Sequence, residues 1–171
     1  MTSLGTAAST DVTSAREVLT WDDVGRSTRE LAHAVVDSGY LPDVVVAVAR
    51  GGLVPGGALA YALGVKAVGT LNVEFYTGVD ARLPDPVVLP PLLDTAALGG
   101  HRALVVDDVA DTGETLALVV RLLRPHCADV RSAVLYAKPR SVIEPDHVWR
   151  RTDRWITFPW SADPPVPAGG V

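Results

Sequence analysis

Three short apolar runs constrain the fold of this 171-residue chain more than any other feature. The first, Val44–Ala49, has no polar alternation, which predicts a strand buried on both faces, as in a parallel sheet. Ala103–Asp107 is expected to be a second buried strand, and Val130–Ala137 a third strand. Helical patterns alternate with them and indicate an α/β fold with a central, mainly parallel sheet flanked by helices. The helices are expected from Thr20 to Gly39, from Val54 to Leu63 and from Glu114 to Leu123.

The segment from residue 65 to residue 100 divides into two parts. Residues 65–76 have strand character, whereas residues 77–100 carry four prolines and end on two glycines. This composition predicts a long loop, with short strand pieces at most. Long loops in compact domains often act as active-site lids, so a flexible lid is expected over residues 77–100.

Bulk composition limits the classes of function. The net charge of −5 predicts a surface that repels nucleic acid. Cys127 is the only cysteine, which excludes an intrachain disulfide and a cysteine-based zinc site. No apolar run reaches the roughly 18 residues that a membrane span needs. Residues 1–14 are small and polar, without a signal pattern, so we expect a disordered tail there and a cytoplasmic protein.

The turn after the second apolar run is the most informative segment for function. Asp107 and Asp108 lie at the expected strand tip, and Asp111–Thr115 open a helix. The start of a helix offers backbone N–H groups and the positive end of a dipole, which together bind anions. Carboxylates suit hydroxyl groups, or a Mg²⁺ ion that a phosphate also contacts. A sugar phosphate with a metal ion satisfies all these groups at once.

Two other interpretations of this turn are weaker. A capped helix start with favourably placed acids explains Asp107 and Asp108 alone, but not the whole pattern of residues 103–115. No Gly-x-x-x-x-Gly-Lys-Ser/Thr sequence occurs, which excludes a Walker-type nucleotide site. No Gly-x-Gly-x-x-Gly follows a strand either, so a dinucleotide-binding fold has no support.

Residues 103–115 resemble the signature with which type I phosphoribosyltransferases bind phosphoribosyl pyrophosphate (PRPP). Ala110 departs from the larger aliphatic residue usual there and should pack rather than contact ligand. The resemblance implies that Asp107 and Asp108 hold the ribose hydroxyls, and that Asp108 also contacts Mg²⁺, mostly through PRPP and water. It implies further that the 5′-phosphate is wrapped by Asp111, Thr112, Gly113, Glu114 and Thr115. Asp111 is then also the catalytic residue, because it faces N7 of a purine.

Arg50, Gly51 and Gly52 follow the first apolar run. Glycines permit close backbone approach, and an arginine offers a planar fork of donors to phosphate oxygens. On its own the segment is a glycine-rich turn with an exposed arginine. Beside the first signature it resembles the pyrophosphate loop of 6-oxopurine phosphoribosyltransferases, in which a non-proline cis peptide bond often occurs. The resemblance implies that all three residues bind PRPP.

Lys138 and Trp155 bear on the choice of base. A lysine at a strand end can donate to a carbonyl oxygen, and an indole offers a face for a planar base. Without the signature at residues 103–115, these residues favour a simpler interpretation, in which Lys138 is a surface charge and Trp155 a core or interface aromatic. The segments around them resemble xanthine–guanine-type enzymes of bacteria and archaea. That resemblance implies that Lys138 binds the purine O6, that Trp155 stacks on the ring, and that the backbone of Ile156 binds the base edge.

The resemblance implies a type I phosphoribosyltransferase fold with a small hood and a flexible lid loop. The single domain is expected over residues 15–162, with the hood mainly from 138–162 and a Pro/Gly-rich tail over 163–171. The implied reaction transfers the phosphoribosyl group from PRPP to guanine, xanthine or hypoxanthine with Mg²⁺, in a homodimer or homotetramer. Two alternatives stay open: an enzyme for adenine or a pyrimidine, and a non-catalytic PRPP-binding regulator.

Overall fold

The computed structural model describes residues 16–78, 81–88 and 94–167. It groups the chain into two compact units, one formed by Trp21–Asp153 and a smaller one formed by Met1–Thr20 with Arg154–Val171. The predicted tail over residues 1–14 lies outside the described residues. Within the described ranges, no helix is both long enough and apolar enough to cross a membrane.

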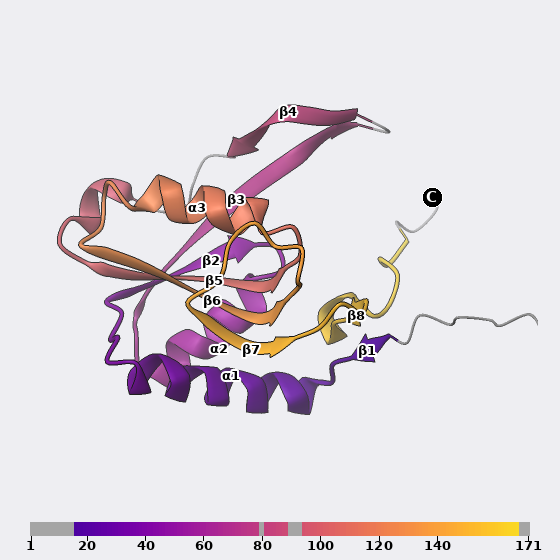
Figure 1. The fold of residues 1–171 in the computed structure, drawn as a ribbon, viewed down its shortest axis with the longest axis horizontal. Coiled ribbons are helices and arrows are strands. Elements are labelled where there is room, and N and C mark those ends of the chain that lie inside the picture. Colours follow the sequence, from indigo (N-terminus) through magenta and orange to yellow (C-terminus); the bar gives the residue numbers. More distant parts are fainter. Residues whose placement is uncertain (1–15, 79–80, 89–93, 168–171) are drawn as a thin grey trace, which may run out of the picture. The chain divides into compact units, whose positions relative to one another are not determined.

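A six-stranded sheet forms the centre of the larger unit, with the strand order β4-β3-β2-β5-β6-β7 (Figure 1). The neighbouring pairs from β3 to β7 are all parallel, and β4 alone pairs antiparallel, with β3. The strands are β2 (Val44–Ala49), β3 (Ala67–Gly78), β4 (Ala81–Val88), β5 (Arg102–Ala110), β6 (Asp129–Ala137) and β7 (His147–Arg151). The expected mainly parallel sheet flanked by helices is therefore confirmed.

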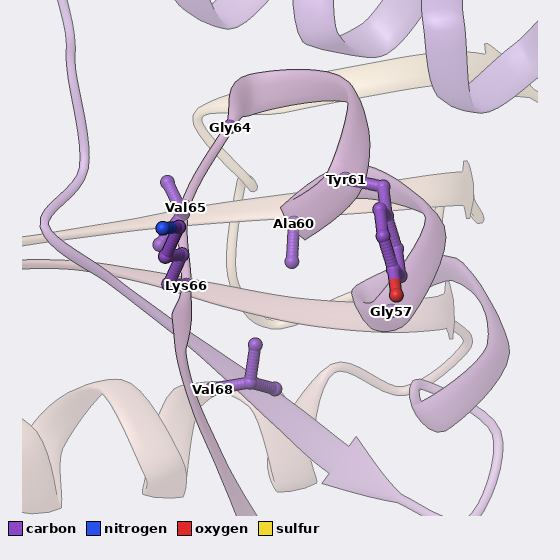
Figure 2. A pocket seen from close by; sticks show the side chains of 7 residues that line it. All are labelled: Gly57, Ala60, Tyr61, Gly64, Val65, Lys66 and Val68. Atoms are coloured by element: carbon purple, nitrogen blue, oxygen red, sulfur yellow. The ribbon is translucent and has the colours of Figure 1, made fainter.

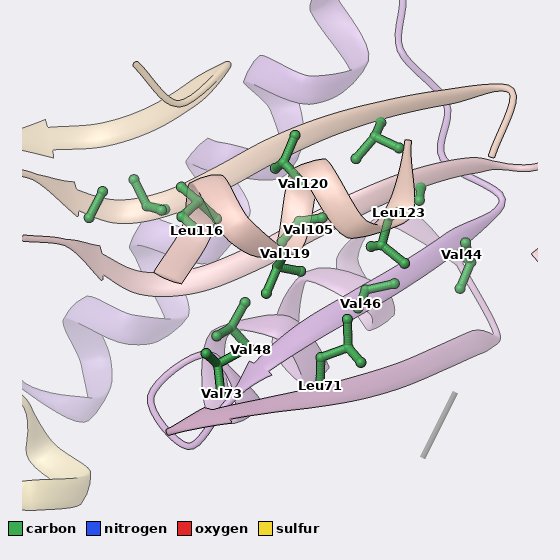
Figure 3. Packing of buried hydrophobic residues seen from close by; sticks show 14 of the residues in the cluster. Val44, Val46, Val48, Leu71, Val73, Val105, Leu116, Val119, Val120 and Leu123 are labelled. Carbon is green, nitrogen blue, oxygen red and sulfur yellow. The ribbon is translucent and has the colours of Figure 1, made fainter. Parts of the chain in front are cut away.

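Helices cover both faces of this sheet (Figure 1). Helix α3 (Glu114–Leu123) packs on one face, while α1 (Trp21–Asp37) and α2 (Leu53–Leu63) pack on the other. A 3-10 turn, η1 (Thr95–Leu98), precedes β5. The apolar side of α3 meets β-branched residues of the central strands in the core drawn in Figure 3. Its members include Val46, Val48, Val105, Leu116, Val119, Val120 and Leu123.

The order in which strands are added to the sheet reverses between β2 and β5. Strand β2 leads through α2 to β3 on one side, whereas β5 leads through α3 to β6 on the other. Open parallel sheets bind ligands outside the carboxyl ends of their strands at such a switch point. The segments that follow β2 and β5 are therefore expected to share one ligand.

The smaller unit is built around a short parallel pair, β1 (Glu17–Val18) and β8 (Ile156–Thr157). The Glu17 amide donates to the Trp155 carbonyl at 2.8 Å, and the Leu19 amide donates to the Thr157 carbonyl at 3.0 Å. A 3-10 turn, η2 (Pro159–Ser161), follows β8. The rings of Phe158 and Trp160 stack with centroids 4.9 Å apart.

Several boundaries differ from the sequence prediction. Strand β5 continues to Ala110 because its last residues still pair with β6, through Val109 with Tyr136 and Ala110 with Ala137. The predicted loop over residues 77–100 contains the eight-residue strand β4 and the turn η1. Residues 138–162, which are expected to form most of the hood, contain β7, β8 and η2. The hood limits of 138–162 stay a prediction; residues up to Asp153 group with the sheet.

Candidate active site

The β2–α2 loop lies directly against β5. Strand β2 pairs with β5 only as far as Ala47 opposite Val106, and the Ala49–Arg50 peptide bond after it is cis. A Cβ atom on Gly51 would lie 2.3 Å from Oδ2 of Asp108. A Cβ atom on Gly52 would lie 2.3 Å from the Val106 carbonyl oxygen. The loop can therefore lie this close to β5 only because glycines occupy both positions.

Asp107 and Asp108 form a carboxylate pair at this edge of the sheet. Asp107 is buried, with 8% of its surface exposed, and its Oδ1 accepts a 2.9 Å hydrogen bond from the Asp108 amide. Burial, followed by the negative charge of Asp108, raises the pKa of Asp107 well above its usual value. A buried carboxyl group beside a partly buried one favours hydroxyl donors or a cation as its partner.

The β5–α3 turn is fixed by its glycine and by the loop that follows β6. Gly113 has a φ of 75°, in the left-handed region that favours glycine, and it caps the ten-residue helix α3. A Cβ atom there would lie 2.2 Å from Oγ of Ser141. The Val142 amide also donates to the Thr112 carbonyl at 2.7 Å. The turn that opens α3 therefore packs tightly against the β6–β7 loop and is hydrogen-bonded to it.

Asp111 lies between two cationic side chains of the β6–β7 loop. Its Oδ1 is 3.3 Å from Nζ of Lys138, which is itself buried. Arg140 donates from Nε and Nη2 to Oδ1, at 3.0 and 2.5 Å, and from Nη2 to Oδ2, at 2.5 Å. Burial works to raise the pKa of Asp111, but the hydrogen bonds and charges of Arg140 and Lys138 outweigh it and lower the pKa below its usual value. Asp111 is therefore held ionised.

The residues predicted from sequence are distributed over both units. The larger unit brings Gly51 against Asp108, and Asp111 against Lys138. It also holds exposed Arg50 on the β2–α2 loop, with Thr112, Glu114 and Thr115 at the start of α3. The smaller unit holds Trp155, 59% exposed, and Ile156, which is buried. Contact of all these residues with a substrate stays a prediction, and the predicted lid lies partly outside the described residues.

Arg140 is the residue that the sequence prediction missed. It stands two positions after Lys138 in Lys138-Pro139-Arg140-Ser141, directly after β6. A second cation beside a predicted base-binding lysine is a signal that sequence reading could have used. Its partner, however, lies 29 positions earlier in the chain, and only the fold brings the two together.

An apolar pocket of about 500 Å³ lies away from this site (Figure 2). Its lining comes from the end of α2 and the start of β3, including Tyr61, Val65 and Val68. Val68 pairs with Val45 near the start of β2, whereas Arg50 follows the end of β2. The pocket is thus at the opposite edge of the sheet from the acid pair, and it takes no part in the chemistry argued below.

Comparison with known proteins agrees with this fold. Residues 14–165 match the phosphoribosyl transferase domain family, and the chain belongs to that family. It is 35% identical over 162 residues to the xanthine-guanine phosphoribosyltransferase of Gluconobacter oxydans, covering 93% of this chain and 92% of that protein. A second protein of that name, from Cereibacter sphaeroides, is 35% identical over 150 residues, with 83% and 84% covered.

The fold has matches among solved structures as well. The crystal structure of a purine phosphoribosyltransferase from Pyrococcus horikoshii aligns with a TM-score of 0.76 at 34% identity. The alignment covers 90% of this chain and 99% of that one. The type I phosphoribosyltransferase fold predicted from residues 103–115 is thereby confirmed.

Proposed function

We propose that this protein transfers the 5-phosphoribosyl group from PRPP to a 6-oxopurine, releasing pyrophosphate and the nucleoside monophosphate. One observation carries the proposal: Asp111 and Lys138 form an ion pair at 3.3 Å beside the turn that opens α3. A carboxylate and an ammonium group so arranged match the N7 and O6 edge of a 6-oxopurine. The similarity to purine phosphoribosyltransferases supports the same reaction.

PRPP would lie across the switch point between β2 and β5. Asp107 and Asp108 would accept hydrogen bonds from the ribose hydroxyls, which suits a buried carboxyl group beside a partly buried one. The turn from Asp111 to Thr115 would bind the 5′-phosphate through backbone N–H groups and the two threonine hydroxyls. Arg50, Gly51 and Gly52 would bind the pyrophosphate, with the glycines allowing the backbone to approach it.

Mg²⁺ fits this site as an ion shared with the substrate. In the part of the chain that the structure describes, no three His, Cys, Asp or Glu side chains gather as a metal-binding cluster. Mg²⁺ in phosphate-handling sites is commonly held by one or two carboxylates together with substrate oxygens. Asp108 is the residue proposed to contact it. The ion would neutralise charge on the departing pyrophosphate.

The base would be held by one charged pair and one aromatic face. Lys138 would donate to O6, Asp111 would accept the proton at N7, Trp155 would stack on the ring, and the Ile156 backbone would bind the base edge. Departure of pyrophosphate leaves positive charge on the ribose C1 carbon, and the base nitrogen forms its bond there. The protein contributes alignment and charge stabilisation to this step.

A steady-state assay over a panel of bases tests the proposal. With PRPP and Mg²⁺ held constant, guanine, xanthine and hypoxanthine should each give a nucleoside monophosphate at least about tenfold more efficiently than adenine or uracil. The reason is that the ammonium group of Lys138 donates hydrogen bonds, and the 6-amino group of adenine offers it no acceptor in place of O6. Faster turnover of adenine or a pyrimidine would contradict the choice of base. PRPP binding without turnover of any base would indicate a regulatory protein.

A homodimer or homotetramer and a cytoplasmic location also remain proposals. Sedimentation of the purified protein measures the first. Fractionation of the producing cells measures the second.

A further inference from the structure

The two oxygens of the Asp111 carboxylate are unequally engaged. Oδ1 lies near three donor nitrogens, Nζ of Lys138 and both Nε and Nη2 of Arg140. Oδ2 accepts from Nη2 of Arg140 alone among the described contacts. Each carboxylate oxygen accepts about two hydrogen bonds. Oδ1 is therefore saturated, and Oδ2 keeps room for one more donor.

We infer that Arg140 is a positioning residue that turns the Asp111 carboxylate so that Oδ2 meets the N7 proton of the purine. The inference rests on the proposed function and adds a residue to it. Arg140 does not contact the base in this account. It acts through Asp111, by fixing the orientation of the carboxylate and by keeping it ionised.

The backbone around Arg140 supports this role. The Ser141 amide donates to the Lys138 carbonyl at 3.0 Å, which closes a four-residue turn with Pro139 at the position proline favours. The Lys138 amide donates to the Ala110 carbonyl at 3.0 Å and so ties the start of this turn to β5. A short turn anchored to the strand that directly precedes Asp111 aims both cations at one carboxylate.

The charges that face Asp111 are those of Lys138 and Arg140, both from the β6–β7 loop. Asp108 faces Gly51 of the β2–α2 loop instead, and Glu114 is exposed at the start of α3. The side chain of Arg140 is 62% exposed and that of Asp111 is 38% exposed. Exposed ion pairs add little to folding stability. The pair is therefore expected to affect the reaction more than the fold.

The test compares Arg140→Gln and Arg140→Lys with a matched control, Arg102→Gln. Arg102 begins β5, at the end of the strand far from Asp111. It forms an exposed ion pair with Asp43, with its Nε 3.3 Å from Oδ2 of Asp43. The readouts are the pH dependence of kcat/KM for one purine base at saturating PRPP, the KM for PRPP, and thermal unfolding. The pKa of Asp111 in the free protein is followed separately by carbon NMR, with the signal assigned from Asp111→Asn.

Arg140→Gln should lower kcat/KM by about tenfold near neutral pH and more below it. The sign follows from the lowered pKa of Asp111: without Arg140 this pKa rises, so the acid limb of the profile moves to higher pH. In Arg140→Lys, the acid limb should return to its wild-type pH, because a positive charge again faces Asp111. Only part of the rate should return, because an ammonium group does not form the two-pronged hydrogen bonds of a guanidinium to both carboxylate oxygens. Arg102→Gln should leave the profile, the KM for PRPP and the Asp111 signal unchanged.

Three results would overturn the inference. The first is a pH profile of kcat/KM in Arg140→Gln that matches the wild type. The second is an equal loss of rate at every pH while the NMR signal of Asp111 does not move, which would indicate a merely structural role. A loss of PRPP binding equal to the loss of kcat/KM would assign Arg140 to PRPP instead. Failure of the proposed function looks different: it appears as full turnover in Asp111→Asn, or as no turnover by the unaltered protein.

Discussion

The β2–α2 loop and the β5–α3 turn meet at the same edge of the sheet, but different forces hold them. The first is fixed by lack of space, because a Cβ atom on Gly52 would collide with backbone oxygens of both β2 and β5. The second is fixed largely by charge and hydrogen bonds, through Asp111 with Lys138 and Arg140. Packing is insensitive to pH and salt, whereas exposed ion pairs respond to both. The two sides of the proposed PRPP site should therefore fail in different ways.

The largest effect is expected from Gly52→Ala. The added methyl group would lie 2.3 Å from the Val106 carbonyl oxygen and 2.7 Å from the Val48 carbonyl oxygen, and neither backbone atom can move aside cheaply. The free energy of unfolding should fall by about 3 kcal/mol, and activity should be lost at every pH and salt concentration. Chemical denaturation and steady-state assays measure both.

Gly57→Ala is the matched control for that change. Gly57 lies inside α2, and a Cβ atom there would meet nothing within 4 Å. In a helix interior, alanine is more stabilising than glycine by roughly 0.5–1 kcal/mol. This variant should therefore be slightly more stable than the wild type and fully active. Equal damage from both substitutions would show that α2, rather than the tight loop, is the sensitive element.

Asp111→Asn should have the next largest effect, and it should act on rate rather than on fold. Removal of the proposed proton acceptor should lower kcat by about 100-fold or more. The free energy of unfolding should stay within about 1 kcal/mol of the wild type, because the ion pair that is lost is partly exposed. If Asp111→Asn lost stability but kept its kcat, the proposal that charge in the β5–α3 turn serves the reaction rather than the fold would be wrong.

Gly113→Ala should show that the second region also contains one position fixed by space. Alanine at a φ of 75° is strained, and its Cβ atom would lie 2.2 Å from Oγ of Ser141. We expect a loss of about 2 kcal/mol in the free energy of unfolding. Removing the hydroxyl with Ser141→Ala should recover part of that loss in the double variant. An additive double variant would mean that backbone strain, together with the approach of the Cβ atom to Cγ2 of Ile143 at 2.9 Å, is responsible.

The smallest effect, of opposite sign, is expected from Asp107→Asn. The pKa of Asp107 is raised above 3.8, so the folded state binds its proton more tightly than the unfolded state does. Stability is therefore lost as the pH rises through the interval between the unfolded and folded pKa values. The asparagine variant lacks this loss and should be about 1 kcal/mol more stable at pH 7, with weaker PRPP binding. Unfolding curves at pH 4 and pH 7 test the sign, since the gain should vanish at the lower pH.

Strands buried on both faces were predictable because their composition leaves few alternatives. Val44–Ala49 forms a strand with the predicted limits, and α3 spans the predicted Glu114–Leu123. Strand β7 was missed because His147–Arg151 is mostly polar and lies at the sheet edge, where its last two residues are exposed. Strand β4 was missed because its two prolines argue against a strand, although an edge position tolerates them.

The candidate site was predictable where a motif is continuous in sequence. Asp107, Asp108 and Asp111 lie on one strand and its turn, so their order along the chain already indicated a common site. The partner of Asp111 could not be predicted in the same way, because Arg140 reaches it across the sheet from a different loop. The collision that excludes a side chain at Gly51 likewise depends on the distance between two strands.

The pairing of β1 with β8 has a consequence for how the chain is made (Figure 1). Glu17 and Val18 are synthesised well before their partners Ile156 and Thr157, because all strands of the six-stranded sheet lie between them in the sequence. The segment that carries Trp155 thus acquires its neighbouring strand only after every strand of that sheet has been synthesised. A nascent chain stalled before Trp155 would contain the sheet with Asp107 and the turn with Asp111, and would lack the stretch proposed to receive the base.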